Sequence, residues 1–383
     1  MRKIKVMSVF GTRPDAIKMA PLVKELSRYE DLESICCLTG QHREMLDIVM
    51  DVFRLKADYD LKIMEKQQTL STITSKAILG MDQVIEACHP DLILVHGDTS
   101  TAFAGALSAF YHKIPVGHVE AGLRTWDKYS PFPEEMNRTL VGDIAELHFS
   151  PTKANADNLR REGIGGKIFI TGNTAIDAMS YTVRESRPFT TQLLNQLDFS
   201  GRRIIAMTCH RRENYGEPMR QIMTAVREVV DLHPDVEVVY PVHLAPAVQE
   251  CAHSILGGHN RIHLIDHLDA EDMHNLIARC YMVMTDSGGL QEEAPALGKP
   301  VLVMRRETER PEAVEAGTVK LAGVTKDAIL SMANELLDSP QAYAKMAKAV
   351  NPYGDGKACE RIAQAIRWHF GLLDDRPADF QPQ

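Results

Sequence analysis

Residues 91–101 read DLILVHGDTST, and this stretch decides the fold. Its four consecutive apolar residues, 92–95, end in a polar turn, a pattern typical of a parallel strand with both faces buried. A helical pattern follows from Thr101 to Tyr111. The same order occurs earlier, where IKVMSV at residues 4–9 precedes a helical pattern over 16–29. Repetition of this strand–helix unit predicts a parallel sheet covered by helices on both faces.

A second series of strand-like runs begins after a polar, weakly periodic stretch at residues 184–201. Its five runs are RRIIAMTCH (202–210), VEVVYPVH (236–243), RIHLID (261–266), MVMTDSGG (282–289) and KPVLVM (299–304). We therefore expect an α/β fold of two Rossmann-like doubly wound domains, residues 1–173 and 174–364. The C-terminal helix within 365–383 is expected to pack back on the first domain, and the tail DDRPADFQPQ (374–383) is expected to be frayed.

Composition restricts the class of protein. The 383 residues include 52 acidic and 43 basic side chains, and a net charge of −9 argues against a general nucleic-acid binder. No apolar run approaches the roughly 18 residues of a membrane-spanning helix, and the N-terminal apolar stretch is too short for a signal peptide. The seven cysteines show no CxxC pair, so a cytoplasmic protein with reduced thiols is expected. The fifteen histidines are dispersed without HExxH, and no metal site is expected.

Ligands of doubly wound sheets bind beyond the carboxyl ends of the strands. After the first strand, residues 11–18 read GTRPDAIK, which matches neither the GxGxxG dinucleotide motif nor the P-loop. A glycine turn that opens a helix attracts anions, and this one contains the cations Arg13 and Lys18. The alternative is an ordinary Gly-Pro turn with solvated charges.

Three carboxylates follow later strands of the first half. Asp98 ends DLILVHGD, Glu120 ends PVGHVE, and Glu134 lies in the loop segment SPFPEEMNR together with Arg138. Carboxylates that share one crevice have perturbed pKa values and are suited to proton transfer. The alternatives are that Asp98 caps the next helix, and that Glu134 and Arg138 form an ordinary i,i+4 pair on a helix surface.

The strand ends of the second half carry cations and small residues. TCHRREN places His210 and Arg211 directly after a strand, an arrangement that suits phosphate binding. In TDSGG, the small residues 287–289 let a phosphate approach the backbone, and Glu293 on the following helix can accept ribose hydroxyls. Arg310 adds a further cation. The alternative for His210 and Arg211 is a solvated turn. The alternative for Glu293 is an acid in the first helical turn that the helix dipole favours. Cys209, beside a histidine, is expected to be a small buried side chain.

Seven segments, in order, resemble the non-hydrolysing UDP-N-acetylglucosamine 2-epimerases of bacteria: GTRPDAIKMAP, VHGDTST, GHVEAGLRT, PEEMNR, CHRREN, TDSGGLQEEAP and ERPEA. The resemblance extends over nearly the whole chain. It implies the glycosyltransferase-B-like fold, in which two domains face each other across a cleft that contains the active site. It also implies interconversion of UDP-N-acetylglucosamine and UDP-N-acetylmannosamine without a cofactor.

The resemblance also assigns roles to residues. Those that would hold UDP are Arg13, His210, Ser287, Gly288, Gly289, Glu293 and Arg310, and those that would surround the sugar are Lys18, Asp98, Glu120, Glu134 and Arg138. The catalytic residues would be Asp98, Glu120, Glu134 and His210. Met273 stands where an aromatic residue often packs on the uracil, so looser base stacking is expected.

Bacterial members of this family resemble one another in a regulatory pocket at which the substrate, UDP-N-acetylglucosamine, activates the enzyme. The matching residues are Gln41, His42, Gln68, Arg211 and His243. Position 67 departs from the pattern, because Gln67 replaces a common arginine and a neutral amide cannot make a charge-assisted phosphate contact. The resemblance further implies a homodimer that supplies the synthesis of cell-surface polysaccharides.

The chemistry of the implied reaction explains why several acids are needed. The hydrogen on C2 is not adjacent to a carbonyl, so direct removal by a carboxylate faces a prohibitive barrier. Departure of UDP from C1 acidifies that hydrogen, and its removal leaves a 2-acetamidoglucal. Two proton-handling groups on opposite faces then complete the epimerisation, and Asp98, Glu120 and Glu134 are the candidates for them. The alternatives are a hydrolysing epimerase that releases N-acetylmannosamine, a UDP-sugar glycosyltransferase and a catalytically silent nucleotide-sugar sensor.

Overall fold

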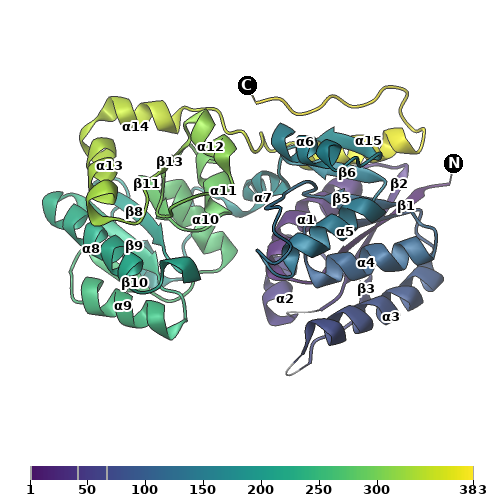
Figure 1. The fold of residues 1–383 in the computed structure, drawn as a ribbon, viewed down its shortest axis with the longest axis horizontal. Coiled ribbons are helices and arrows are strands. Elements are labelled where there is room, and N and C mark those ends of the chain that lie inside the picture. The colour runs from purple at the N-terminus through teal and green to yellow at the C-terminus, as the bar shows by residue number, and fades with distance from the viewer. Residues whose placement is uncertain (1, 41–42, 66–67, 383) are drawn as a thin grey trace. The chain divides into compact units, whose positions relative to one another are not determined.

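The computed structural model describes residues 2–40, 43–65 and 68–382. The chain forms two compact units (Figure 1). Unit 1 comprises the residues up to Tyr181 together with Tyr353–Pro382, and unit 2 comprises Thr182–Pro352. Each unit is built around one parallel sheet with alternating helices, as the repeated strand–helix pattern predicts.

Unit 1 contains a seven-stranded sheet in the order β3-β2-β1-β4-β5-β6-β7, with every neighbouring pair parallel. Its elements are β1 (Ile4–Phe10), α1 (Arg13–Leu26), β2 (Leu32–Leu38), α2 (Arg43–Val52), β3 (Tyr59–Asp60), α3 (Leu70–Cys88), β4 (Leu92–His96), α4 (Ser100–Tyr111), β5 (Val116–Val119), α5 (Glu134–Ile144), β6 (Leu147–Ser150), α6 (Lys153–Arg161), β7 (Lys167–Ile170), α7 (Thr174–Thr182) and α15 (Ala358–His369).

The central strand β4 shows why this sheet needs helices on both faces. Leu92 and Leu94 belong to a core that includes side chains of α1, α2 and α15. Ile93 and Val95 point the other way, into a core that includes side chains of α3 and α4. Successive residues of a strand point to opposite faces, so a continuous apolar run requires a hydrophobic layer on each side.

Unit 2 contains a six-stranded parallel sheet in the order β10-β9-β8-β11-β12-β13. Its elements are the 3-10 helix η1 (Gln192–Gln196), β8 (Arg203–Thr208), the 3-10 helix η2 (Arg212–Asn214), α8 (Glu217–Leu232), β9 (Val236–Pro241), α9 (Pro246–Leu256), β10 (Ile262–Ile265), α10 (Ala270–Arg279), β11 (Met282–Thr285), α11 (Leu290–Ala296), β12 (Val301–Val303), α12 (Pro311–Ala316), β13 (Val319–Leu321), α13 (Lys326–Asp338) and α14 (Pro340–Ala347). Five of these strands correspond to the predicted runs, and β13 is additional.

The strand order reverses once in each unit. The first strand of unit 1, β1, lies between β2 and β4, and the first strand of unit 2, β8, lies between β9 and β11. The connections after β1 and β4, and likewise after β8 and β11, therefore leave in opposite directions. Open parallel sheets bind their ligands at such reversals.

The limits of the compact units differ from the predicted domains 1–173 and 174–364. Residues 174–181 and 353–364 belong to unit 1, because α7 and α15 are joined there. The Asp177 carboxylate on α7 accepts hydrogen bonds from the backbone N–H groups of Ala358 and Cys359, at 3.1 and 2.8 Å. Asp177 thus caps the start of α15 from a distant part of the sequence.

The expectation of a frayed C-terminal tail is wrong. Phe380 is buried, and its backbone N–H donates to the carbonyl of Ile170 at 2.6 Å. The carboxylate of Asp379 accepts from the Ile170 N–H at 3.0 Å, and the Arg361 guanidinium lies 5.0 Å from the centre of the Phe380 ring. The tail therefore docks on β7, the edge strand of the sheet.

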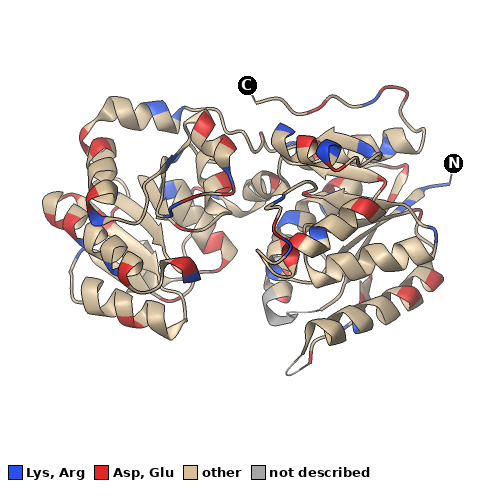
Figure 2. Cartoon of the chain, viewed as in Figure 1, with Lys and Arg blue, Asp and Glu red and all other residues tan. Residues whose placement is uncertain are grey.

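Charged residues of both signs are interspersed along the helices of both units (Figure 2). Among residues 2–40, 43–65 and 68–382, no helix combines the length and apolar character needed to cross a bilayer. Cys209 is completely buried, as expected of a small apolar side chain, and its burial raises the pKa of the thiol well above the ordinary value.

Two buried histidines on neighbouring strands make unit 1 sensitive to acid. Burial lowers the pKa of His118 on β5 from 6.5 to about 3, and that of His148 on β6 to about 4. The unfolded chain protonates both near 6.5, so unfolding takes up protons below that pH. Stability should therefore fall as the pH drops below 6.5, with a slope that approaches about 1.4 kcal/mol per pH unit for each histidine until its folded pKa is reached.

We predict that His118→Gln reduces this pH dependence by about 1.4 kcal/mol per pH unit, because one of the two groups no longer titrates. Urea unfolding followed by tryptophan fluorescence measures the effect, since both tryptophans, Trp126 and Trp368, lie in unit 1. The matched control is the exposed His253→Gln, which should leave the slope unchanged. An equal slope in His118→Gln and the wild type would contradict the prediction.

Candidate active site

Gly11 and Thr12 turn the chain from β1 into α1. A Cβ at Gly11 would lie 1.7 Å from the Thr39 hydroxyl oxygen, so this turn has room only for glycine. The Thr12 side chain caps α1, and the helix begins with Arg13 and a proline in its first turn. The predicted glycine turn that opens a helix is thus present, and it places Arg13 and Lys18 on α1.

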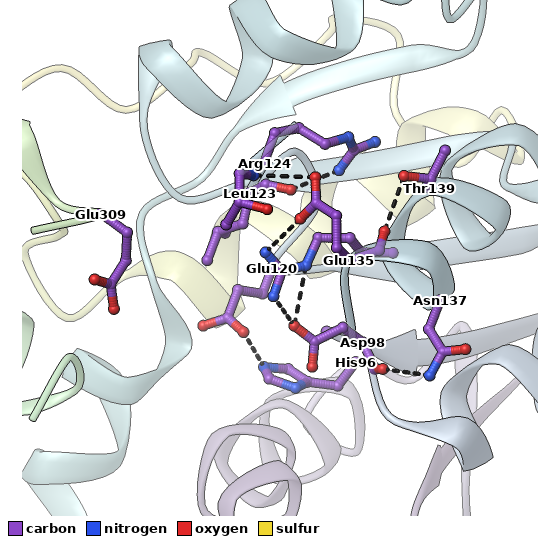
Figure 3. Close-up of polar contacts among 12 residues, drawn as sticks. His96, Asp98, Glu120, Leu123, Arg124, Glu135, Asn137, Thr139 and Glu309 are labelled. Carbon is purple, nitrogen blue, oxygen red and sulfur yellow. Dashed lines mark hydrogen bonds and ion pairs between the residues drawn. The ribbon is translucent and has the colours of Figure 1, made fainter. Parts of the chain in front are cut away.

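Glu120 lies directly after β5 and is held by groups from other elements. Lys18 from α1 forms an ion pair with its Oε1 atom, and the Asn173 amide donates to the same oxygen at 3.2 Å. The second oxygen, Oε2, faces Nε2 of His96 at 3.8 Å (Figure 3). The backbone of Glu120 has φ +63°, a conformation that non-glycine residues seldom adopt. The surrounding contacts therefore hold this carboxylate in a specific orientation.

Asp98 follows β4 and is held by α5 (Figure 3). Arg138 forms an ion pair with the Asp98 carboxylate, with Nε at 3.1 Å from Oδ2, and the Asn137 side chain donates to the Asp98 carbonyl at 2.9 Å. Thr99 provides the cap of α4, so the alternative that Asp98 is that cap is wrong. The carboxylate of Asp98 is instead one partner of a charged pair at the edge of the sheet.

The alternative that Glu134 and Arg138 form an ordinary i,i+4 pair is wrong. Arg138 pairs instead with Asp98 and Glu135. Its Nη1 atom lies 3.1 Å from the carboxylate of Glu135, which also accepts from the backbone N–H groups of Thr125 and Trp126 at 3.0 Å each. Glu135 therefore fixes the loop before α5 and orients Arg138. This role depends on contacts with residues about ten positions away, so neighbouring sequence letters alone do not distinguish Glu135 from Glu134.

Glu134 is the first residue of α5. Its Oε2 atom is buried and has no hydrogen-bond partner among the described residues. Buried carboxylate oxygens are nearly always paired, and an unpaired one calls for an explanation, such as a ligand. The structure thus places Asp98 and Glu120 directly after β4 and β5, and Glu134 at the start of α5 in the same unit.

In unit 2, the loop after β8 is organised by the buried carboxylate of Asp286, which follows β11. Its Oδ2 atom accepts from the backbone N–H groups of His210 and Arg211, at 2.8 Å each, and from the Asn214 side chain at 3.1 Å. The His210 ring lies 3.5 Å from Oδ1 and stacks on the His243 ring, with 5.4 Å between centroids. Burial lowers the pKa of His210, and the neighbouring Arg211 and His243 act in the same direction.

The residues after β11 form a second charged group. Ser287 donates its backbone N–H to the Thr285 hydroxyl at 2.9 Å, and a Cβ at Gly288 would lie 2.5 Å from the Arg310 guanidinium. Arg310 forms ion pairs with Glu292 and Glu309. Burial raises the pKa of Glu309, but Arg310 and Arg305 outweigh this effect and lower it to about 2. The Arg310 side chain thus lies against Gly288, and its phosphate-binding role stays a prediction.

Glu293 on α11 and Met273 on α10 complete the predicted set in unit 2. The Glu293 carboxylate lies 3.5 Å from Nε2 of His274, whose other nitrogen is 2.7 Å from the Thr182 hydroxyl. A Cβ at Gly289 would lie 3.5 Å from Glu293, so the carboxylate is close to the Ser-Gly-Gly backbone. Met273 is half-buried.

The predicted regulatory residues are only partly described. Gln41, His42 and Gln67 lie outside the described residues. Gln68 in unit 1 donates its side-chain amide to the carbonyl of Ile63. Arg211 and His243 lie in unit 2, with Nη2 of Arg211 at 3.9 Å from Glu309.

Several site residues were not singled out from the sequence: Asp15, His96, Asn173, His274, Asp286 and Glu309. A usable signal existed for His96 and Asp286, because each stands at or directly after the end of a strand-like run. Within the described ranges, no group of three or more His, Cys, Asp or Glu side chains has an arrangement that could hold a metal ion.

Two parallel, doubly wound α/β units with these strand-end residues define the glycosyltransferase-B-like class of proteins. A family model described as UDP-N-acetylglucosamine 2-epimerase matches residues 24–367, and the chain belongs to this family. The chain is 54% identical to the UDP-N-acetylglucosamine 2-epimerase of Bacillus subtilis over 99% of both chains.

Solved structures agree with this assignment. A crystal structure of a UDP-N-acetylglucosamine 2-epimerase is 52% identical, with a TM-score of 0.92 and all of both chains covered. The structure of the Neisseria meningitidis UDP-GlcNAc 2-epimerase bound to UDP-GlcNAc is 44% identical, with a TM-score of 0.85, covering 95% of this chain and 99% of that one.

We predict that Asp286→Ala lowers the free energy of unfolding of unit 2 by about 3 kcal/mol, because three donors lose their acceptor. Asp286→Asn is the matched control and should cost less, since its amide oxygen can still accept at the Oδ2 position. Circular dichroism in urea measures the change, while tryptophan fluorescence reports unit 1 separately. Equal losses in the two variants would show that the hydrogen bonds to Oδ2 are not the cause.

Proposed function

We propose that this chain interconverts UDP-N-acetylglucosamine and UDP-N-acetylmannosamine without hydrolysis, through elimination and re-addition of UDP. The observation that carries the proposal is the pair of carboxylates at the ends of adjacent strands, Asp98 after β4 and Glu120 after β5, each ion-paired to a separate cation. Glu134, with a buried oxygen that has no hydrogen-bond partner among the residues that the structure describes, adds a third acid in the same unit. A glycosyltransferase donor site has no need of these three acids.

The acids of unit 1 would handle protons at C2 of the sugar. Lys18 and Arg138 hold Glu120 and Asp98 in fixed positions, which suits proton transfer at defined faces of a planar glycal. Glu120 pairs with Lys18 and Asp98 pairs with Arg138. Because their surroundings differ, one carboxylate can serve as the acid and the other as the base. We leave the assignment of Asp98, Glu120 and Glu134 to the individual faces of C2 open.

The residues of unit 2 would hold UDP. His210 and Arg310 would stabilise the departing diphosphate, which is the electrostatic assistance that contributes most to such bond cleavage. The small side chains of Ser287, Gly288 and Gly289 would let a phosphate approach the backbone beside Arg310, and the Glu293 carboxylate would accept the ribose hydroxyls. The relative from Neisseria meningitidis, solved with UDP-GlcNAc, supports the choice of this nucleotide-sugar.

The match to the bacterial regulatory pattern supports activation by the substrate as part of the proposal. Gln68, Arg211 and His243 are its described members, and Gln67 replaces the arginine that is common at that position. Because a neutral amide binds phosphate more weakly than a guanidinium does, we expect the activation to be weak.

We predict that Asp98→Asn slows epimerisation at least 100-fold while UDP affinity changes less than about threefold, because a proton-handling group is lost and the nucleotide contacts are kept. Incorporation of solvent deuterium at C2 of UDP-N-acetylglucosamine measures the first effect, and calorimetry with UDP measures the second. Asp157→Asn is the control, since Asp157 is an acid of a surface ion pair on α6. A parallel loss of both properties would assign Asp98 to folding.

Product analysis separates the proposal from the hydrolysing alternative. The wild-type protein should accumulate UDP-N-acetylmannosamine from UDP-N-acetylglucosamine. Release of free N-acetylmannosamine in step with UDP would make the chain a hydrolysing epimerase. Absence of deuterium at C2 would instead favour a glycosyltransferase or a silent sensor, since neither breaks the C2–H bond.

A further inference from the structure

His96 is a buried imidazole between two carboxylates. It ends β4, and its side chain is 3% exposed. Its Nδ1 atom lies 3.7 Å from Oδ1 of Asp15, and its Nε2 atom lies 3.8 Å from Oε2 of Glu120 (Figure 3). Neither ring nitrogen has a hydrogen-bond partner within the described part of the chain. Buried polar atoms without partners are uncommon, so the position calls for a physical explanation.

The two oxygens of Glu120 have different surroundings. Lys18 and Asn173 contact Oε1, whereas Oε2 faces His96. A carboxylate held in this way can keep one oxygen fixed by the cation while the other gains or loses a proton. The imidazole lies beside the oxygen that the Lys18 and Asn173 contacts do not use.

Other titratable groups also face His96. Asp15 comes from the first turn of α1, and its second carboxylate oxygen lies 3.4 Å from the Thr99 hydroxyl. His118 on β5 donates from Nε2 to the Gly97 carbonyl at 2.7 Å, and burial keeps the ring neutral by lowering its pKa to about 3. A neutral His118 adds no charge here, so the two carboxylates dominate the charge around the His96 ring.

We propose that His96 is a positioning residue that relays protons between Glu120 and Asp15. This inference rests on the proposed function, in which Glu120 exchanges a proton with C2. When Glu120 carries the proton, Oε2 passes it to Nε2 of His96, and Nδ1 of His96 passes its own proton to Asp15. Glu120 returns to the carboxylate form, His96 is neutral again in its other tautomer, and Asp15 holds the proton until the path reverses.

The geometry is close to that of a working relay. Shortening either contact to hydrogen-bond length requires the atoms to approach by roughly 0.7–1 Å, a shift that side-chain adjustment allows. Imidazole is suited to this position because its two nitrogens can donate and accept in turn. A relay buried in the protein moves the proton from Glu120 without admitting water, which would otherwise hydrolyse the glycal intermediate.

We predict that His96→Gln lowers the rate of deuterium incorporation at C2 about 100-fold with KM within threefold, and that its pH–rate profile loses one ionisation of the wild type. Glutamine keeps a donor and an acceptor, so it can replace a structural role but cannot relay a proton. Asp15→Asn should show the same loss of ionisation with a smaller rate effect. The control is His112→Gln, which alters a more exposed histidine–aspartate pair between the C-cap of α4 and Asp82 on α3, at 3.1 Å.

The outcomes separate this inference from the function on which it rests. If wild-type protein incorporates deuterium and His96→Gln does so at the same rate, the relay is wrong and the epimerase proposal stands. A slower His96→Gln that retains the full wild-type pH–rate profile would also refute the relay and assign His96 to packing. If the wild type incorporates no deuterium, the proposed function itself fails.

Discussion

The reversal of strand order at β1/β4 and at β8/β11 is the constraint on which the rest of the structure depends. Where two neighbouring connections leave the sheet in opposite directions, neither connection covers the gap between them. The strand ends at this gap can therefore carry polar residues. In unit 1 these ends carry His96 and Asp98, and in unit 2 they carry His210 and Asp286. The helices contribute indirectly, because they bury both faces of the strands and so keep those ends rigid.

Several charges at these strand ends and the neighbouring loops are paired with charges of opposite sign. Lys18 holds Glu120, Arg138 holds Asp98, and Arg305 and Arg310 hold Glu309. Desolvating such a charge is costly, and the loss of one partner leaves the other uncompensated. The Lys18–Glu120 and Arg138–Asp98 pairs join residues 102 and 40 positions apart, so the placement of these two acids depends on the whole unit rather than on one motif. Arg305, Glu309 and Arg310, in contrast, lie in one segment between β12 and α12. The ion pairs therefore place the acidic side chains precisely, at the expense of the stability of the segments that carry them.

Much of the fold could be predicted from the sequence, because long apolar runs such as LILV on β4 identify strands buried on both faces. Short strands were not predicted: β13 has three residues and includes Lys320, and β6 has four and includes His148. The strand-end position of Asp98 and Glu120 could also be predicted, but their partners could not be fully identified, since Asn173 lies 53 residues from Glu120. The same limit applies to the domain boundary, where Asp177 caps a helix that begins 181 residues later.

The docked C-terminal segment has a consequence for the edge of the unit 1 sheet. An edge strand exposes unpaired backbone groups that can recruit a strand from another molecule. The segment around Phe380 occupies the N–H and C=O groups of Ile170 on β7, so they are not available to a foreign strand. The segment therefore shields part of the edge strand β7. Displacing the segment would open it to edge-to-edge aggregation.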